Sequence, residues 1–153
     1  MYRKGVSALI INNHNQFLLV NLESFKEKFF AIPGGGIEQG ETLEDAVYRE
    51  VHEELGIAKK SLEMEGQSET PVKFKFKVIK LNRDGQDYEG SERYFFGFRF
   101  VGSENEIKLQ DGEVRAYKWV PLAELKEYLL FDNQLQETME KIAEIFPSIA
   151  AGI

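Results

Sequence analysis

The sequence predicts a mixed α/β fold of the α+β kind, in which strands and helices do not follow the regular βαβ alternation of a doubly wound parallel sheet. Apolar runs of strand length occur in both halves of the chain, and one amphipathic helix follows a run of glycines. The 153 residues, of which 42% are hydrophobic, suffice for one domain with a sizeable core. No internal repeat or long linker divides the chain, so we expect a single domain over residues 1–153.

The first strands are predicted by apolar residues on both sides of a polar turn. Residues 6–11 are apolar or small, residues 12–15 are an asparagine-rich turn, and residues 17–22 predict the returning strand. A further short strand is expected at residues 29–32, just before Pro33.

A helix over residues 42–55 is the clearest single element. Thr42 followed by Asp45 three residues later is typical of a helix N-terminus, and Gly56 suits the position just past the C-terminus. The apolar stripe of this helix has a four-residue spacing and consists of Leu43, Val47, Val51 and Leu55. The glycines at 34–36 are expected to form a loop, because three glycines favour neither a helix nor a strand interior.

The second half of the chain is predicted to contain three strands and then two helices. Residues 72–81 alternate lysines with apolar residues, which indicates a strand with one wet, basic face and one buried face. The further elements expected are a polar loop at 82–90, strands at 93–101 and 114–120, helices at 121–130 and 133–145, and a tail after Pro147.

The composition excludes several functional classes. The formal net charge of −7 argues against a whole-surface affinity for nucleic acid, although acidic residues gathered at a metal site can still act on a phosphate. The chain has no cysteine, which excludes disulfides, thiolate metal sites and a cysteine nucleophile, and which suits a cytoplasmic protein. No apolar run approaches the roughly 18 residues of a membrane span, so we expect no membrane partner.

Three glutamates on the predicted helix are the first candidates for chemistry. Glu50, Glu53 and Glu54 stand at positions i, i+3 and i+4, which places their carboxylates on one face, where they repel one another. Mg²⁺ or Mn²⁺ binds such clusters of hard oxygen ligands, although a solvated acidic face explains the helix alone equally well. The glycines at 34–36 favour the metal site, because bare backbone can approach a phosphate or offer a carbonyl to a metal.

Together these residues resemble the Nudix box, whose pattern is G-x5-E-x7-R-E-U-x-E-E-x-G-U, with U an aliphatic residue. The matching positions are Gly35, Glu41, Arg49, Glu50, Val51, Glu53, Glu54, Gly56 and Ile57, with no departure. The resemblance implies an α/β/α sandwich with a mixed central sheet. It also implies a Mg²⁺ or Mn²⁺ cofactor and cleavage of a nucleoside diphosphate linked to another group.

The resemblance carries roles over to the matching positions. Glu50 and Glu54 become the first-choice metal ligands, and Arg49 becomes the residue that orients one of the glutamates. A backbone carbonyl near Gly35 is a further expected ligand. Glu53 is either a third ligand or the base that takes a proton from the attacking water.

Glu113 is the best candidate outside the box. It lies in a loop six residues before Trp119, where many family members place a glutamate that reaches the metals as ligand or base. Glu53 and Glu113 therefore remain rivals for the catalytic base. The alternative for Glu113 is an exposed loop acid without a catalytic role.

Segments outside the box resemble one branch of the family, the RNA pyrophosphohydrolases and dinucleoside polyphosphate hydrolases. They are Tyr2-Arg3-x-x-Val6, Tyr88-x-Gly90 with the aromatic strand that follows it, the stretch from Glu113 to Trp119, and Phe131. The leading substrate is therefore a 5′-triphosphorylated RNA, and free nucleoside triphosphates, dinucleoside polyphosphates or nucleotide sugars are the alternative. The chain departs from the branch at Gly34, where a glutamine is common, and after Phe131, where Asp132 and Asn133 replace basic residues.

The candidate substrate-binding residues are Gly34, Gly35, Gly36, Phe131, Arg93 and Lys73. A base could stack on Phe131, although ordinary core packing is the alternative for this residue. Lys73 could belong to a basic rim that steers phosphate or to a solvated strand face. Arg93 and Arg99 could touch phosphates, but the strand alternation does not indicate which face they occupy.

Two other classes compete with a hydrolase. A binding or sensor domain on the same fold usually loses glutamates of the box, whereas all are present here. An isomerase on this fold relies on a cysteine, which the chain lacks. Family members are often dimers, so a homodimer is one expected assembly.

Overall fold

The computed structural model describes residues 1–81 and 87–152, with the backbone alone over residues 76–81. In chain order the elements are β1 (Tyr2–Ile11), β2 (Phe17–Leu22), β3 (Gly34–Gly36), α1 (Leu43–Leu55), η1 (Lys59–Ser61), β4 (Leu62–Gln67), β5 (Val72–Leu81), β6 (Asp87–Phe100), η2 (Glu104–Glu106), β7 (Val114–Val120), η3 (Leu122–Glu127), α2 (Gln134–Ile145) and α3 (Pro147–Ala150).

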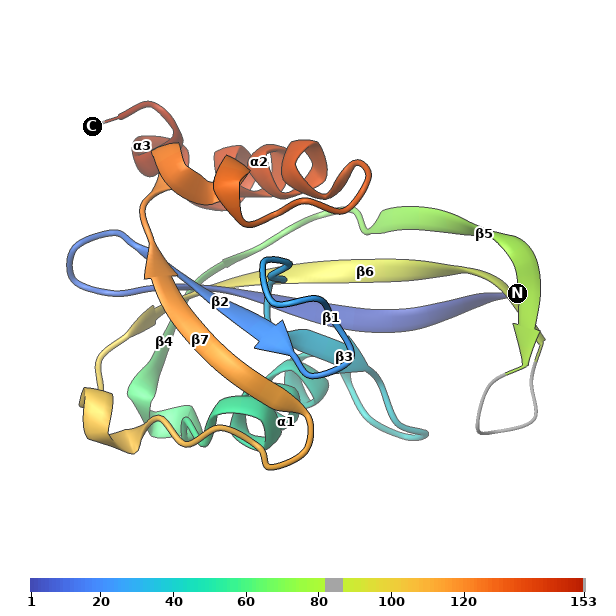
Figure 1. The fold of residues 1–153 in the computed structure, drawn as a ribbon, viewed down its shortest axis with the longest axis horizontal. Coiled ribbons are helices and arrows are strands. Elements are labelled where there is room, and N and C mark those ends of the chain that lie inside the picture. Colours follow the sequence, from blue (N-terminus) through green and yellow to red (C-terminus); the bar gives the residue numbers. More distant parts are fainter. Residues whose placement is uncertain (82–86, 153) are drawn as a thin grey trace.

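The described strands form one seven-stranded mixed sheet that lies between helices (Figure 1). The main strand order is β4-β6-β1-β2-β7, with β3 paired to β1 and β5 paired to β6. The pair β1 and β6 is parallel, and the other pairs are antiparallel. Figure 1 shows α1 on one face of the sheet and α2 with α3 on the other, so the expected α/β/α sandwich with a mixed sheet is confirmed.

The central strand β1 is buried on both faces, which explains its unbroken apolar sequence. Val6, Ala8 and Ile10 belong to the core that includes α1, whereas Leu9 and Ile11 belong to the core that includes α2. This rigid strand carries β3 along its N-terminal half. It therefore fixes the position of the glycines relative to both layers of helices.

Local sequence signals set both ends of α1, as expected. The hydroxyl of Thr42 accepts a hydrogen bond from the backbone N–H of Asp45 at 3.0 Å. At the other end Gly56 adopts a left-handed conformation with φ +70°, and its N–H donates to the carbonyl of His52. The helix is thus held in one register, which fixes the direction of its glutamates.

The glycines at 34–36 form the strand β3, so the prediction of a loop is wrong. They pair with Gly5, Val6 and Ser7 of β1 in antiparallel register. A Cβ on Gly34 would overlap the carbonyl oxygen of Val6, so a bare backbone is what this close pairing requires. Tertiary pairing with β1 outweighs the weak strand propensity of glycine.

Several strand boundaries also differ from those expected. Residues 29–32 form only a single bridge, between Ala31 and Val20. Two residues later the carbonyl of Pro33 already accepts a hydrogen bond from the N–H of Ala8 in β1, so the pairing with β2 does not continue. The strand β6 begins at Asp87, where it pairs with Leu81, and the remaining residues 82–86 of the expected loop lie outside the described part of the chain.

The structure adds elements that the hydrophobic pattern did not indicate. The strand β4 pairs with the C-terminal half of β6, although most of its residues are polar or exposed. The helix expected at 121–130 is the shorter 3₁₀-helix η3, and the expected tail begins with the four-residue helix α3. In β5, which pairs with β6, Phe74 is 48% exposed, so the expected burial fails at this residue, whereas the side chains of Phe76 and Val78 lie outside the described part of the chain.

Candidate functional site

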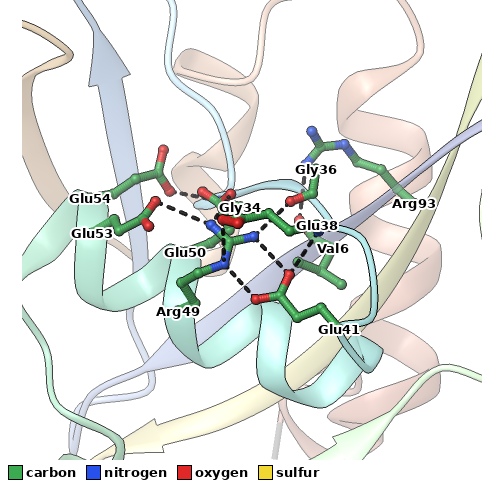
Figure 2. A network of polar contacts seen from close by, with 10 residues as sticks. All are labelled: Val6, Gly34, Gly36, Glu38, Glu41, Arg49, Glu50, Glu53, Glu54 and Arg93. Atoms are coloured by element: carbon green, nitrogen blue, oxygen red, sulfur yellow. Dashed lines mark hydrogen bonds and ion pairs between the residues drawn. The ribbon is translucent and has the colours of Figure 1, made fainter. Parts of the chain in front are cut away.

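The candidate site forms where β3 runs beside α1 (Figure 2). The backbone N–H of Gly34 donates to a carboxylate oxygen of Glu54 at 2.9 Å. A Cβ on Gly35 would lie 2.5 Å from the carboxyl carbon of Glu50, so only glycine lets this carboxylate approach the strand. The bare backbone and the glutamates therefore form one unit, although they are separated in sequence.

Arg49 lies at the centre of a network of ion pairs (Figure 2). Its guanidinium donates twice to Glu41, from Nε at 2.6 Å and from Nη2 at 2.9 Å. Its Nη1 contacts Glu50 at 3.0 Å and Glu53 at 3.2 Å, and Nη2 also donates to the carbonyl of Gly36 at 2.9 Å. One arginine thus joins the helix to the end of β3 and offsets the repulsion between the glutamates.

Glu54 is the most deeply buried acid of the site, with 7% of its surface exposed. Burial raises the pKa of Glu54 to about 8, and the charges of Glu50 and Glu113 act in the same direction. The hydrogen bond from Gly34 and the charge of Arg93 oppose this increase in pKa without cancelling it. A carboxyl in this setting gains strongly from a nearby cation.

Arg93 supports Glu54 from the opposite direction. Its guanidinium donates to the carbonyl of Val6 at 3.2 Å and to the hydroxyl of Ser7 at 2.9 Å. Burial lowers the pKa of Arg93, and the charges of Glu54 and Glu50 oppose that change. Strand β6 therefore points Arg93 toward the carboxylates, which settles the face that the sequence left open.

The donor set fits a hard divalent cation. Among the described residues, no three acidic or histidine side chains lie close enough together to form a metal site. Glu50 and Glu53 instead each form an ion pair with Arg49. Burial also raises the pKa of Glu50, against the opposing effect of Arg49. Two carboxyls that are costly to ionise, beside a strand without side chains, have the chemistry that Mg²⁺ or Mn²⁺ suits.

The carboxylates open onto a broad groove of about 1300 Å³. The residues from α1 that line it are Arg49, Glu50 and Glu53, and the loop between β3 and α1 contributes Glu38 and Glu41. Glu113, from the loop before β7, lines the same groove. The structure therefore brings Glu53 and Glu113, the rival bases, to one space. The N-terminal end of β1 contributes Tyr2, Arg3 and Lys4 to the same lining.

A smaller cavity of about 240 Å³ is lined by Gly34 at the start of β3. Its lining combines apolar and aromatic groups with polar ones, and comprises Ser7, Val20, Leu22, Phe25, Ala31, Ile32, Gly34, Glu54, Arg93, Phe95, Asp132, Gln134, Glu137 and Thr138. Glu54 and Gly34 thus face this cavity, whereas Gly36 and Glu50 face the groove.

Comparison with known proteins decides the family. The model of the NUDIX domain matches residues 1–142. The chain belongs to the Nudix family. It is 29% identical over 148 residues to an RNA pyrophosphohydrolase from Pelagibacter ubique, covering 94% of this chain and 92% of that one. It is 31% identical over 123 residues to an RNA pyrophosphohydrolase from Vibrio atlanticus, covering 78% of this chain and 70% of that one.

A solved structure shares the fold of this Nudix hydrolase. The NUDIX hydrolase from Nitrosomonas europaea matches with a TM-score of 0.70 and 20% identity, over 95% of this chain and 91% of that chain. At this identity the likeness shows the fold alone. The Nudix assignment made from the box is thus confirmed, whereas the roles of single residues remain to be tested.

Other predicted contacts lie outside the two spaces of this Nudix hydrolase. Phe131 is 42% exposed and makes edge and tilted contacts with Phe25 and Phe29, so it is not the core residue that was one alternative. Lys73 lies 3.8 Å from Glu92 and lines neither the groove nor the smaller cavity. Arg99 donates to the carbonyl of Asn12 at the far end of β1, away from the carboxylates.

Sequence reasoning missed several residues that line these spaces. Gln134, Glu137 and Thr138 reach the smaller cavity together because they stand at i, i+3 and i+4 on α2. That spacing was visible in the sequence, but nothing in it showed which face of α2 meets the sheet. Arg3 belonged to a family resemblance without a role, and the structure places it in the groove.

Proposed function

We propose that this Nudix hydrolase removes pyrophosphate from 5′-triphosphorylated RNA in a Mg²⁺-dependent reaction. The observation that carries the proposal is the broad groove of about 1300 Å³ next to the glutamates of α1. The end of a polymer needs a space through which the rest of the chain can leave, and a groove of this kind provides it. The names of the relatives from Pelagibacter ubique and Vibrio atlanticus support the same substrate.

The acidic side chains of the site have different roles in the proposed reaction. Glu50 and Glu54 would hold Mg²⁺, aided by backbone near Gly35, and Arg49 keeps Glu50 directed toward β3. When bound, the metal lowers the pKa of a water molecule and neutralises phosphate oxygens. Glu53 or Glu113 then accepts the proton of the attacking water, since both line the groove.

Free nucleotides or dinucleoside polyphosphates are the second candidate class of substrate. Asp132 and Glu137 add two carboxyl groups to the lining of the smaller cavity, which also contains Glu54. Carboxylates repel a phosphodiester backbone but accept hydrogen bonds from the edge of a base. This cavity therefore suits a nucleoside better than an RNA strand, and a small nucleotide could use it without entering as a polymer.

Product analysis distinguishes the two classes. Release of phosphate and pyrophosphate should be measured with Mg²⁺ from triphosphorylated RNA, GTP and a dinucleoside polyphosphate at equal concentrations. We expect the largest kcat/KM for RNA. A larger kcat/KM for either free nucleotide would reject RNA as the preferred substrate and leave the hydrolase assignment intact.

The rival bases can be separated on the best substrate. The variants Glu53→Gln and Glu113→Gln should be compared by their pH–rate profiles and by their Mg²⁺ concentration for half-maximal rate. Loss of the base removes most of kcat with little change in the metal requirement, whereas loss of a ligand raises that requirement.

The proposal extends to a cytoplasmic enzyme that forms a homodimer. Sedimentation at micromolar concentration tests the assembly, and a monomer at that concentration would reject it.

A further inference from the structure

The pairing of three strands places Arg3 against the end of β3. Gly5 of β1 lies opposite Gly36 of β3, and Arg3 lies opposite Ser91 of β6. A Cβ on Gly36 would overlap the guanidinium of Arg3, so this guanidinium occupies the space that a side chain at position 36 would need. Arg3 thus lies on the bare backbone of Gly36 and lines the same groove as the glutamates.

The other arginines near the carboxylates already have protein partners. Arg49 contacts four glutamates and the carbonyl of Gly36. Arg93 donates to Val6 and Ser7. Within residues 1–81 and 87–152, by contrast, the guanidinium of Arg3 has no hydrogen bond or ion pair, and the side chain is exposed. Its five N–H donors are therefore available to a ligand.

The surroundings of Arg3 favour an anion. Burial is the main cause that lowers the pKa of Arg93 on the neighbouring strand β6, and the positive charge of Arg3 acts in the same direction. The two positive charges repel one another in the free protein, and an anion beside Arg3 relieves the repulsion. The neighbouring Lys4 is also exposed and lines the same groove. Arg3 and Lys4 thus bring positive charge to a groove whose other charged lining residues are glutamates and Arg49.

We propose that Arg3 binds a phosphate next to the cleaved bond and thereby gives the enzyme a preference for longer phosphate chains. The cleaved phosphate must lie beside Glu50 and Glu54, and Gly36 separates that position from Arg3. A planar guanidinium can hold two oxygens of one phosphate, which a lysine cannot do in the same geometry. The ligand is a di- or triphosphate group, whether it belongs to RNA or to a free nucleotide. This inference rests on the proposed site on α1 and β3 but not on the choice between those substrates.

Binding of unreactive phosphate chains tests the role of Arg3 directly. The probes are the methylene-bridged analogues of inorganic diphosphate and triphosphate, measured by calorimetry with Mg²⁺. The wild-type protein should bind the triphosphate analogue more tightly. Arg3→Gln should weaken that binding by about 10- to 100-fold, the range for a hydrogen bond to a charged group, and weaken diphosphate binding less. Arg3→Lys, which keeps the charge but not the fork, should fall between the two proteins.

Two further variants test whether a loss of binding comes from the change in net charge or from a destabilised strand. Lys126→Gln removes an exposed charge that lines neither space, so it controls for net charge and should bind both probes as the wild type does. Arg3→Met keeps an unbranched aliphatic side chain at this position and gives the same comparison should glutamine destabilise the strand. Circular dichroism confirms that each variant is folded.

The outcomes separate this inference from the substrate proposal. Equal binding of the triphosphate analogue by wild type and the Arg3 variants would overturn it, as would an equal loss in Lys126→Gln. Neither measurement requires turnover, so they remain informative even where RNA proves not to be the substrate. On whichever nucleotide is cleaved, Arg3→Gln should raise KM more than it lowers kcat.

Discussion

Glu54→Gln should remove most of the stability that the metal-free protein loses as the pH rises from about 5 to 8. The carboxyl of Glu54 is 7% exposed, and burial raises its pKa to about 8. The folded protein therefore holds a proton on this group over a range where the unfolded chain, with a pKa near 4.5, has released it. A group with a raised folded pKa stabilises the fold below its unfolded pKa, and this contribution disappears as the pH passes the folded pKa.

The magnitude follows from the two pKa values. A rise from 4.5 to about 8 corresponds to roughly 3–5 kcal/mol of unfolding free energy, at about 1.4 kcal/mol for each pH unit. Typical domains are stable by only about 5–15 kcal/mol, so such a loss is easily measured. Glutamine does not titrate, and its carbonyl can still accept from Gly34. Glu50, whose pKa is also raised, leaves a smaller dependence in the variant.

The assay is urea unfolding in EDTA at pH 5, 6, 7 and 8 for the wild type and Glu54→Gln. The two should be similar at pH 5, and the variant should be the more stable at pH 8. Glu53→Gln is the matched control, because it makes the same change on the same helix at a side chain that is 45% exposed. A variant that keeps the wild-type pH dependence would refute the idea that Glu54 is protonated in the metal-free fold.

Magnesium gives the second arm of the same experiment. A ligand that binds only the folded state at 100 times its Kd adds about 2.7 kcal/mol. Because the metal competes with the proton on Glu54, its stabilising effect should grow between pH 6 and 8 in the wild type. Little or no effect is expected in Glu54→Gln, which should also lose most of its activity while it stays folded.

Three further substitutions test the geometry of the site. Gly35→Ala should displace the carboxylate of Glu50 and lower kcat/KM by about 10²-fold, with a smaller effect on thermal unfolding; near-normal activity would contradict the close approach seen here. The lysine of Arg49→Lys cannot form hydrogen bonds with Glu41, Glu50 and Gly36 at once. This variant should therefore lower the free energy of unfolding by about 1–3 kcal/mol and should also lower kcat. An unchanged urea midpoint would count against the network. Phe131→Ala should leave stability within about 1 kcal/mol of the wild type because the ring is 42% exposed, and raised KM values would indicate that a base stacks there, where stacking is worth about 1–3 kcal/mol.

The sequence predicted those parts of the fold that depend on neighbours in the chain. The caps of α1 at Thr42 and Gly56, and the apolar stripe between them, act within a few residues, so the helix appeared where it was expected. The apolar strands expected at 6–11 and 17–22 also appeared around their short turn, although the first of them begins earlier, at Tyr2. The mixed sheet followed from the family resemblance and not from the strand pattern, which does not contain the parallel pairing of β1 with β6.

Long-range partners account for most of what the sequence did not show. The burial of Glu54 depends on how closely α1 packs on the sheet, and only the folded chain reveals that Gly34 is its hydrogen-bond donor. The alternation in β6 was visible, but the face taken by Arg93 depends on the pairing with β1. The strand β4 lacks an apolar pattern and is held by its antiparallel pairing with β6.

The strand conformation of β3 explains why three successive glycines are needed. Side chains alternate between the faces of a strand, so a Cβ on Gly35 would meet Glu50 on the side of α1, whereas one on Gly36 would meet Arg3 on the opposite side. A Cβ on Gly34 would strike the backbone of β1 itself. Each glycine thus clears a different neighbour, and a loop would not assign the three directions in this fixed order. The extended strand is what allows the carboxylate of Glu50 to approach one face of the backbone while the guanidinium of Arg3 approaches the other.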